Sequence, residues 1–275
     1  MFDHKALEIL NAQAIAAANV RIEHGGSTLV VTPASCNLTN LEPYQLSRDR
    51  FRGHLCTHSL RDFSSYVERH IGGEADKGAA GFVDQDAMSA TVLFNLGTPE
   101  DAGHGDDKAT LTLKPTAAYS ALLGVAGKQL SQQQLAEWLE DWAPHILASA
   151  GDAQLNIGAA INAVRRMTLK ATAQVDTVVG DFNNSRSTMD EIEAKSLDTL
   201  PTMFVFTTRP YEALEPASIT LRLSVITGEK APVLKLRWVG QEAQQEAFAE
   251  EFKAVLDGEV GGLLPLTIGT YDQGK

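Results

Sequence analysis

The sequence predicts an α+β protein with a mainly antiparallel, mixed sheet and several amphipathic helices. Its β segments come in runs that single helices separate, and the regular strand–helix alternation of a doubly wound fold is absent. No repeat of roughly 20–50 residues indicates a solenoid or a propeller. We expect one domain over residues 1–275, with a candidate boundary between two lobes near 148–156, where the chain reads ASAGDAQLN.

The first part of the chain gives clear local signals. Residues 3–19 predict a helix with Asp3 as its cap, and STLVVTP predicts a short strand. FRGHLCTHS, residues 51–59, alternates like a strand with one polar face. Ser59 can cap the helix SLRDFSSYVERH that follows it. Strands are then expected in AAGFVD, MSATVLFN and KATLTL, the last two as an antiparallel pair with a long connection.

Two helices follow in TAAYSALLG and SQQQLAEWLEDW. In the second, Ser131 and Gln134 have the spacing of a capping box. Trp138 and Trp142 lie on its apolar stripe, a spacing more typical of packing than of a ligand platform. INAVRRM completes a further short helix.

The last third reads as strands and one long helix. TLKATAQVDTVVG predicts a long strand, followed by the polar turn GDFNNSRS. TMFVFTTRP, SITLRLSVITG and PVLKLRWVG predict three more strands, the last two joined by a tight hairpin. We expect an acidic amphipathic helix in QEAQQEAFAEEFKAVLDG, closed by Gly258, and a final strand in LPLTIGTY.

Composition narrows the functional classes. The formal net charge is −12, so nucleic acid can bind only where basic residues cluster locally. Two such groups are visible, Arg48, Arg50, Arg52 and Arg61 in one and Arg165, Arg166 and Lys170 in the other, and we favour a role in balancing nearby acids. Cys36 and Cys56 are too few for a disulfide framework, and we expect both as reduced thiols in the interior. No signal peptide and no apolar run of roughly 18 residues is present, so we expect a cytoplasmic protein without membrane contact.

The segment HGDD is the strongest candidate for catalysis. His104, Asp106 and Asp107 lie in the loop between two predicted strands, and Asp84, Asp86 and Asp181 could add carboxylates to a divalent metal site. Adjacent aspartates on an extended chain point apart, however, and the neighbouring glycines are typical of a solvated turn. We favour the turn.

Two other groups are candidates for binding. His54, Cys56 and His58 share one face of a predicted strand, and imidazole and thiolate groups are zinc ligands. No second ligand pair completes that set, so we expect a polar strand face and no metal cofactor. Asp181, Asn183, Asn184 and Arg186 suit anions or sugars, although a polar connecting loop is the simpler interpretation. Nucleotide-binding, kinase and hydrolase signatures are absent.

Several stretches resemble the YfdQ-like family of phage and prophage proteins, over nearly the whole chain and in the same order. They are FRGHLCTHSLRDFSSYV, FVDQDAMSATVLFNLGTPEDAGHGDDKATLTLKPTAAY, LSQQQLAEWLEDW, GDFNNSRSTMDEIEAKS and LRLSVITG…LKLRWVG…IGTY. The resemblance implies a temperate-phage origin and a bacterial cytoplasm. That family is of unknown function, so the resemblance implies no reaction, cofactor or catalytic residue.

These observations favour an accessory protein that acts by binding, as a homo-oligomer, in phage DNA metabolism or against a host system. The alternatives are a metal-dependent hydrolase of nucleic acid or nucleotides, a self-assembling shell-like protein, and a recombination factor that binds single-stranded DNA. We lean towards a protein that is not an enzyme.

Overall fold

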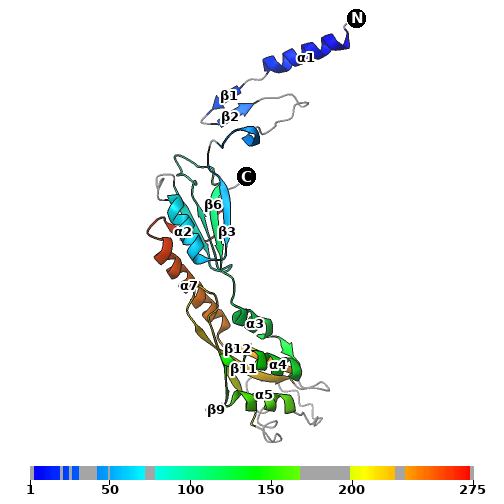
Figure 1. Ribbon diagram of the computed structural model, residues 1–275, viewed down its shortest axis with the longest axis vertical. Coiled ribbons are helices and arrows are strands. Elements are labelled where there is room, and N and C mark those ends of the chain that lie inside the picture. The colour runs from blue at the N-terminus through cyan, green and yellow to red at the C-terminus, as the bar shows by residue number, and fades with distance from the viewer. Residues whose placement is uncertain are drawn as a thin grey trace, which may run out of the picture. The chain divides into compact units, whose positions relative to one another are not determined.

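The computed structural model describes residues 3–18, 21–24, 27–30, 42–48, 50–71, 78–167, 199–226 and 233–272 (Figure 1). The chain divides into two compact units, residues 1–51 and 52–275. The fold class predicted from the sequence, α+β with mostly antiparallel sheets, is confirmed.

The first unit holds a helix and a small hairpin. Helix α1 (His4–Ala18) begins after Asp3, and β1 (Arg21–His24) pairs antiparallel with β2 (Ser27–Val30). A short 3-10 turn, η1, covers Glu42–Tyr44. Leu7 and Leu10, two apolar residues of α1, are 56% and 52% exposed.

The second unit begins with a five-stranded sheet in the order β13-β4-β5-β6-β3. Its strands are β3 (Gly53–Thr57), β4 (Ala80–Asp84), β5 (Ser89–Leu93), β6 (Asp107–Thr112) and β13 (Leu266–Ile268). The three central strands are antiparallel, whereas β3 and β13 add to the edges in parallel. Helix α2 (Leu60–Ile71), capped by Ser59, buries Phe63 and Val67 against one face of this sheet. No helix among the described residues covers the other face.

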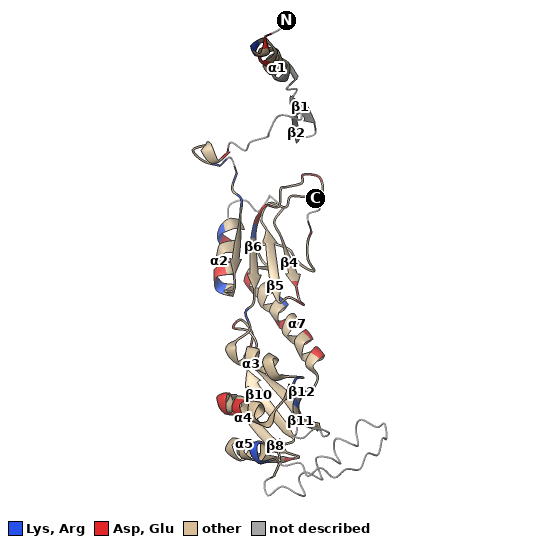
Figure 2. Cartoon of the chain, turned by 90° about the vertical axis from the view of Figure 1, so that its right-hand side faces the viewer, with Lys and Arg blue, Asp and Glu red and all other residues tan. Residues whose placement is uncertain are grey.

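A six-stranded antiparallel sheet follows in the same unit, in the order β7-β12-β11-β10-β8-β9. Its strands are β7 (Gln129–Leu130), β8 (Ile146–Ala150), β9 (Ala153–Leu155), β10 (Met203–Thr208), β11 (Ala217–Ile226) and β12 (Val233–Trp238). Helices α3 (Ala117–Val125), α4 (Gln132–Asp141) and α5 (Ile157–Arg166) lie together on one side of it (Figure 2).

Local sequence signals fix these helices. Thr116 caps α3, and Ser131 and Gln134 form the predicted capping box at the start of α4. A 3-10 turn, η3 (Ala143–His145), follows α4 at Pro144. Trp138 is 8% exposed and its ring stacks on Phe206 with centroids 5.5 Å apart, so the predicted packing role is confirmed.

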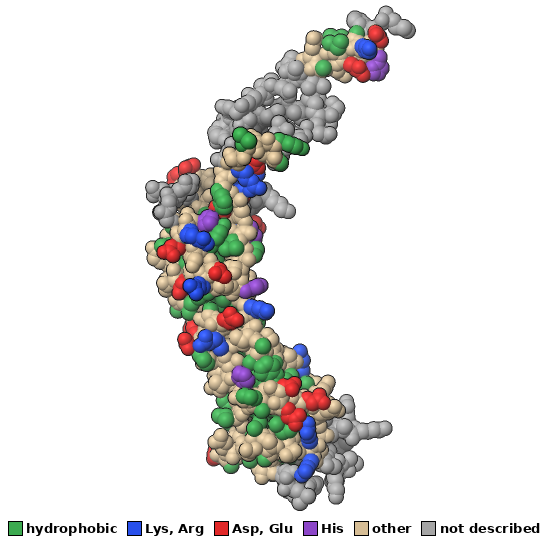
Figure 3. All heavy atoms as spheres, in the orientation of Figure 1, with side chains coloured by type: hydrophobic (Ala, Val, Ile, Leu, Met, Phe, Trp, Pro, Cys, Tyr) green, Lys and Arg blue, Asp and Glu red, His purple; other side chains and the backbone are tan. Residues whose placement is uncertain are grey.

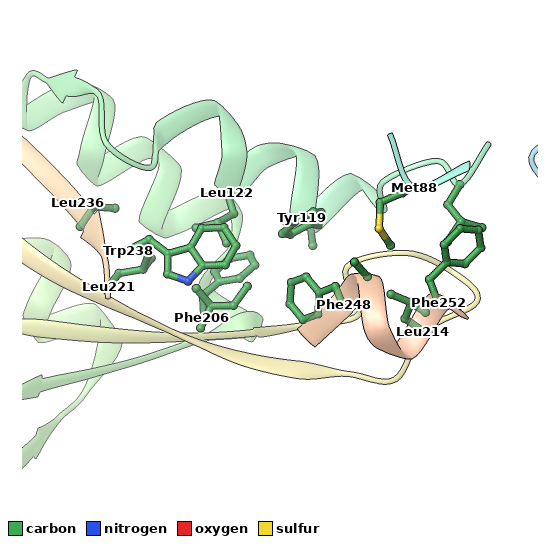
Figure 4. Close-up of a cluster of buried hydrophobic side chains, with 14 of the residues drawn as sticks. Met88, Tyr119, Leu122, Phe206, Leu214, Leu221, Leu236, Trp238, Phe248 and Phe252 are labelled. Carbon is green, nitrogen blue, oxygen red and sulfur yellow. The ribbon is translucent and has the colours of Figure 1, made fainter. Parts of the chain in front are cut away.

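Helix α7 (Gln241–Val260) contributes buried side chains to the hydrophobic core beside both the five-stranded and the six-stranded sheet. Phe248 packs edge-on against Tyr119 beside the six-stranded sheet, while Phe252 lies near Met88, next to the five-stranded sheet (Figure 4). The prediction that Gly258 closes this helix is wrong, because the helix continues to Val260. Val260 is fully buried, and burying a valine offsets the roughly 1 kcal/mol that a glycine costs inside a helix.

Two regions differ from the expectations or lie outside the described residues. The candidate lobe boundary at 148–156 falls on the hairpin of β8 and β9. The segment ILASAGDAQL consists largely of small residues, and its sequence did not predict these two strands. Its turn contains Gly151 with a φ of 55°. The predicted strand at 168–180, the polar turn after it and Cys36 lie outside the described residues. Within the described ranges, no helix is long and apolar enough to cross a membrane.

Candidate functional site

The HGDD loop is held by the side chain and backbone of one residue, Asn95. The Asn95 amide donates to the Asp106 carboxylate at 3.0 Å, and its side-chain oxygen accepts from the backbone N–H of Asp107 at 3.1 Å. The Asn95 carbonyl accepts the N–H of Gly105 at 3.0 Å. The loop is therefore tied at its base, and His104 is exposed.

Asp106 and Asp107 have different surroundings, as expected for neighbours on an extended chain. Asp106 is half-buried, whereas Asp107 is 7% exposed and its Oδ1 has no hydrogen-bond partner. Burial raises the pKa of Asp107. The nearby His70 lowers that pKa, and the neighbouring Asp106 raises it further. The His70 ring stacks on Tyr66, with centroids 3.8 Å apart. The Asp107 carboxylate therefore lies close to the Tyr66 and His70 side chains of α2.

The carboxylates proposed for a divalent metal do not converge on this loop. The Asp84 carboxylate accepts the backbone N–H groups of Asp86 and Ala87 at 3.1 and 3.0 Å, so it caps the turn between β4 and β5. Asp181 is outside the described residues. Among the described residues, no group of three or more His, Cys, Asp or Glu side chains could hold a metal ion.

His54 and Cys56 do share the open face of β3, as the alternation predicted. The Cys56 Sγ lies 3.4 Å from His54 Nε2, and that nitrogen is 2.8 Å from the Thr110 hydroxyl. His58 lies beyond the strand end, and its Nδ1 is 2.6 Å from the carbonyl of Thr112. The prediction that Cys56 lies in the interior is wrong: it is exposed, because α2 covers the opposite face of the sheet.

The basic groups seen in the sequence are paired with neighbours. Arg165 forms an ion pair with Glu140 at 2.8 Å, and Arg166, Arg50 and Arg52 also have interaction partners. Basic and acidic side chains are interspersed over the face of the second unit that Figure 3 shows. Lys170, Asn183, Asn184 and Arg186 lie outside the described residues.

A different basic cluster lies on the open face of the six-stranded sheet. Arg222 on β11 is directly opposite Arg237 on β12, and Lys235 is opposite Ser224 two positions further on. Partners in an antiparallel pair project to the same face, here the one opposite the buried Leu221, Leu223, Leu236 and Trp238. Both arginines are exposed and Lys235 is half-buried. Figure 2 shows basic positions on β11 and β12. We call Arg222, Lys235 and Arg237 the basic face.

The basic face has no acidic counterpart among the described residues. The outward residues of the six strands include no Asp or Glu: they are Gln129, Leu147, Ser149, Gln154, Met203, Val205, Thr207, Ser218, Thr220, Arg222, Ser224, Ile226, Val233, Lys235 and Arg237. Within the described part of the chain, none of the three cations has an ion pair or side-chain hydrogen bond. In a chain of net charge −12, this is a local excess of positive charge.

Sequence reasoning missed this cluster, although a signal was present. In SITLRLSV and VLKLRW, the basic residues alternate with leucines, so each strand places its cations on one face. The register between the two strands, which brings Arg222 beside Arg237, is set in the fold and cannot be read from either segment alone.

The described residues of the second unit form an α+β fold with a five-stranded and a six-stranded sheet, each covered by helices on one side, and the basic face lies on the uncovered side of the larger sheet. Residues 3–271 match the family of uncharacterized conserved proteins DUF2303, and the chain belongs to that family. No curated protein and no solved structure matches the chain.

Proposed function

We propose that the protein is a phage- or prophage-encoded accessory protein of the bacterial cytoplasm that acts by binding, and that its target is a single nucleic acid strand. The resemblance to the YfdQ-like family supports the phage origin. The observation that carries the proposal is the basic face: among the described residues, its three cations have no ion pair and no acid lies on the same face of the sheet.

Two properties of the surface favour a polyanion. Like charges directly opposite each other on neighbouring strands destabilise a sheet, and an anion that bridges Arg222 and Arg237 relieves this repulsion. Arginine also binds phosphate through two parallel hydrogen bonds. A repeating phosphate backbone supplies such anions at regular intervals.

A single strand fits this surface better than a duplex. One row of side chains crosses five strands through Gln154, Ser149, Met203, Arg222 and Arg237, a span of about 19 Å at the usual strand spacing. Met203, with the exposed Leu147 of the neighbouring row, offers apolar surface to unstacked bases. No aromatic ring lies on this face of the described strands, so we expect phosphate contacts to dominate and sequence preference to be weak.

Fluorescence anisotropy with a labelled single-stranded oligonucleotide tests the proposal. With three phosphate contacts, the logarithm of the association constant should fall with the logarithm of salt concentration at a slope of roughly −2. The double variant R222A/R237A should reduce the slope to roughly −0.7. The double variant R165A/R166A removes equal charge from α5 and should keep the slope of the wild type.

Absence of binding at low salt, or an equal loss in both double variants, would refute the proposal. A duplex that binds more tightly than the single strand would contradict the choice of target. The homo-oligomer expected from the sequence stays a prediction, which a mass measurement in solution tests.

A further inference from the structure

The open face of the five-stranded sheet carries a second feature, which does not depend on the basic face. After β13, the N–H of Gly269 donates to the Val83 carbonyl at 2.8 Å, which extends the pairing with β4 by one residue. Gly269 has a φ of 131°, a conformation that glycine adopts readily, and the chain then turns over the sheet. We call residues 269–272 the strap.

The strap covers part of the sheet and leaves a pocket beneath it. The Tyr271 ring stacks on Phe82 with centroids 4.7 Å apart and ring planes inclined by 22°. Leu93, on the same face, is only 4% exposed although no helix covers that face. The pocket has a volume of about 390 Å³, within the usual range for sites of small ligands. Its lining comprises Phe82, Asp84, Ser89, Thr91, Leu93, Lys108, Thr110, Gly269, Thr270, Tyr271 and Asp272.

The floor of the pocket is a row of hydroxyl groups. The hydroxyls of Thr91 and Thr110 are 3.1 Å apart on neighbouring strands, and Thr110 also contacts the imidazole of His54. Burial lowers the pKa of His54, and the positive charge of Lys108 lowers that pKa further, so the imidazole is neutral at pH 7. The floor therefore offers donors and acceptors without adding positive charge.

Among the described residues that line the pocket, Lys108 is the one cation. It stands between His54 and Leu93 in the sheet register and is half-buried. Within the described residues it has no ion pair or hydrogen bond through its ammonium group. A half-buried ammonium without a counterion favours an anionic ligand.

The other side chains that line the pocket indicate which groups the ligand carries besides its negative charge. Tyr271 lines the pocket and is 47% exposed, so it offers ring surface for stacking beyond its contact with Phe82. Asp84 and Asp272 can accept hydrogen bonds from hydroxyl or amino groups. The carboxylates of Asp84 and Asp272 also add negative charge to the lining, which disfavours a ligand with several phosphates.

We propose that the strap pocket binds a nucleoside monophosphate, with the phosphate on Lys108, the base against Tyr271 and the sugar over the threonine hydroxyls. The site goes beyond the strand-binding surface proposed above: its residues come from the other sheet. Inorganic phosphate alone would leave the aromatic side of the pocket unused, and an uncharged nucleoside would leave Lys108 without a counterion.

Isothermal titration calorimetry on the full chain tests the site with adenosine 5′-monophosphate, uridine 5′-monophosphate, adenosine and inorganic phosphate. We expect a monophosphate to bind at least about tenfold more tightly than adenosine or phosphate. Lys108→Met and Tyr271→Ala should each weaken it by roughly tenfold or more. Lys114→Met, an exposed lysine beyond the end of β6, and Tyr44→Ala are the matched controls and should bind as the wild type does.

Three results would overturn the proposal: no heat with either monophosphate at millimolar concentration, equal affinity for inorganic phosphate, or unchanged binding by the Lys108→Met variant. The R222A/R237A variant should bind the monophosphate normally. Loss of this binding in that variant would assign the nucleotide to the basic face and would equally overturn the strap pocket.

Discussion

Arg222 and Arg237 lie directly opposite each other on the neighbouring strands β11 and β12, both exposed and neither with an ion pair among the described residues. Such a pair lowers the stability of the sheet, since like charges are held at cross-strand distance. Binding and stability should therefore respond in opposite directions when one arginine is removed.

We predict that Arg222→Thr raises the free energy of unfolding by about 0.2–1 kcal/mol while it weakens binding of the oligonucleotide. Threonine suits a strand and removes the repulsion. Urea denaturation measures the stability and anisotropy the binding. Arg165→Thr should not stabilise, because Arg165 is paired with Glu140. If Arg222→Thr instead lowers the free energy of unfolding, the packing of the Arg222 side chain stabilises the sheet more than its repulsion with Arg237 destabilises it.

The buried Asp107 should make stability depend on pH. Its folded-state pKa is raised above the unfolded value of 3.8, so the native state holds this proton more tightly. Stability from this group is present at low pH and is lost as pH rises from about 4 through the folded pKa. The unfolding free energy of the wild type relative to that of Asp107→Asn should therefore fall as the pH rises from about 4, as measured by urea denaturation.

Asp106→Asn is the control for that experiment, since Asp106 is half-buried and hydrogen-bonded to Asn95. A difference between wild type and Asp107→Asn that rises with pH would mean that His70 outweighs burial.

Two glycines should respond in opposite ways to alanine. A Cβ at Gly103 would lie 2.0 Å from the carbonyl oxygen of Asn95, whereas a Cβ at Gly258 would have no atom within 4 Å. We expect Gly103→Ala to lose about 1–3 kcal/mol of unfolding free energy and Gly258→Ala to gain about 0.5–1 kcal/mol. Thermal and urea unfolding check both variants. Equal effects would contradict the description of the HGDD loop as closely packed at its base.

Removal of the capping box should destabilise α4. Ser131→Ala deletes the oxygen that accepts the Gln134 N–H at 3.2 Å, and we expect a loss of about 0.5–2 kcal/mol. Gln133→Ala removes only a hydrogen bond to Glu137 along the same helix and should cost about 0.2–0.5 kcal/mol. A loss at Ser131 no larger than that at Gln133 would contradict the importance of the cap.

Local signals predicted most of the elements, whereas the arrangement depended on pairings between distant segments. The caps at Ser59 and Ser131 and the alternation in β3 are properties of a few neighbouring residues, so sequence reasoning found them. The hairpin of β8 and β9 was missed because β8 gains stability from pairing with β10, more than 50 residues later in the chain.

The candidate sites show the same limit. The pair His54 and Cys56 could be placed on one face from the strand period alone. The strap pocket and the basic face both need the strand register, which no single segment contains. Asp107 was singled out for its charge in HGDD, but its burial beneath α2 was not visible in the sequence.

The parallel pairing of β13 with β4 has a consequence for synthesis on the ribosome. Leu266 completes a sheet whose other strands, up to Thr112, emerge much earlier. Until then, the nascent chain carries β4 as an unprotected edge, the kind of template on which foreign strands assemble. Chains released before residue 266 should therefore aggregate, because they lack the strand that pairs with the edge of β4.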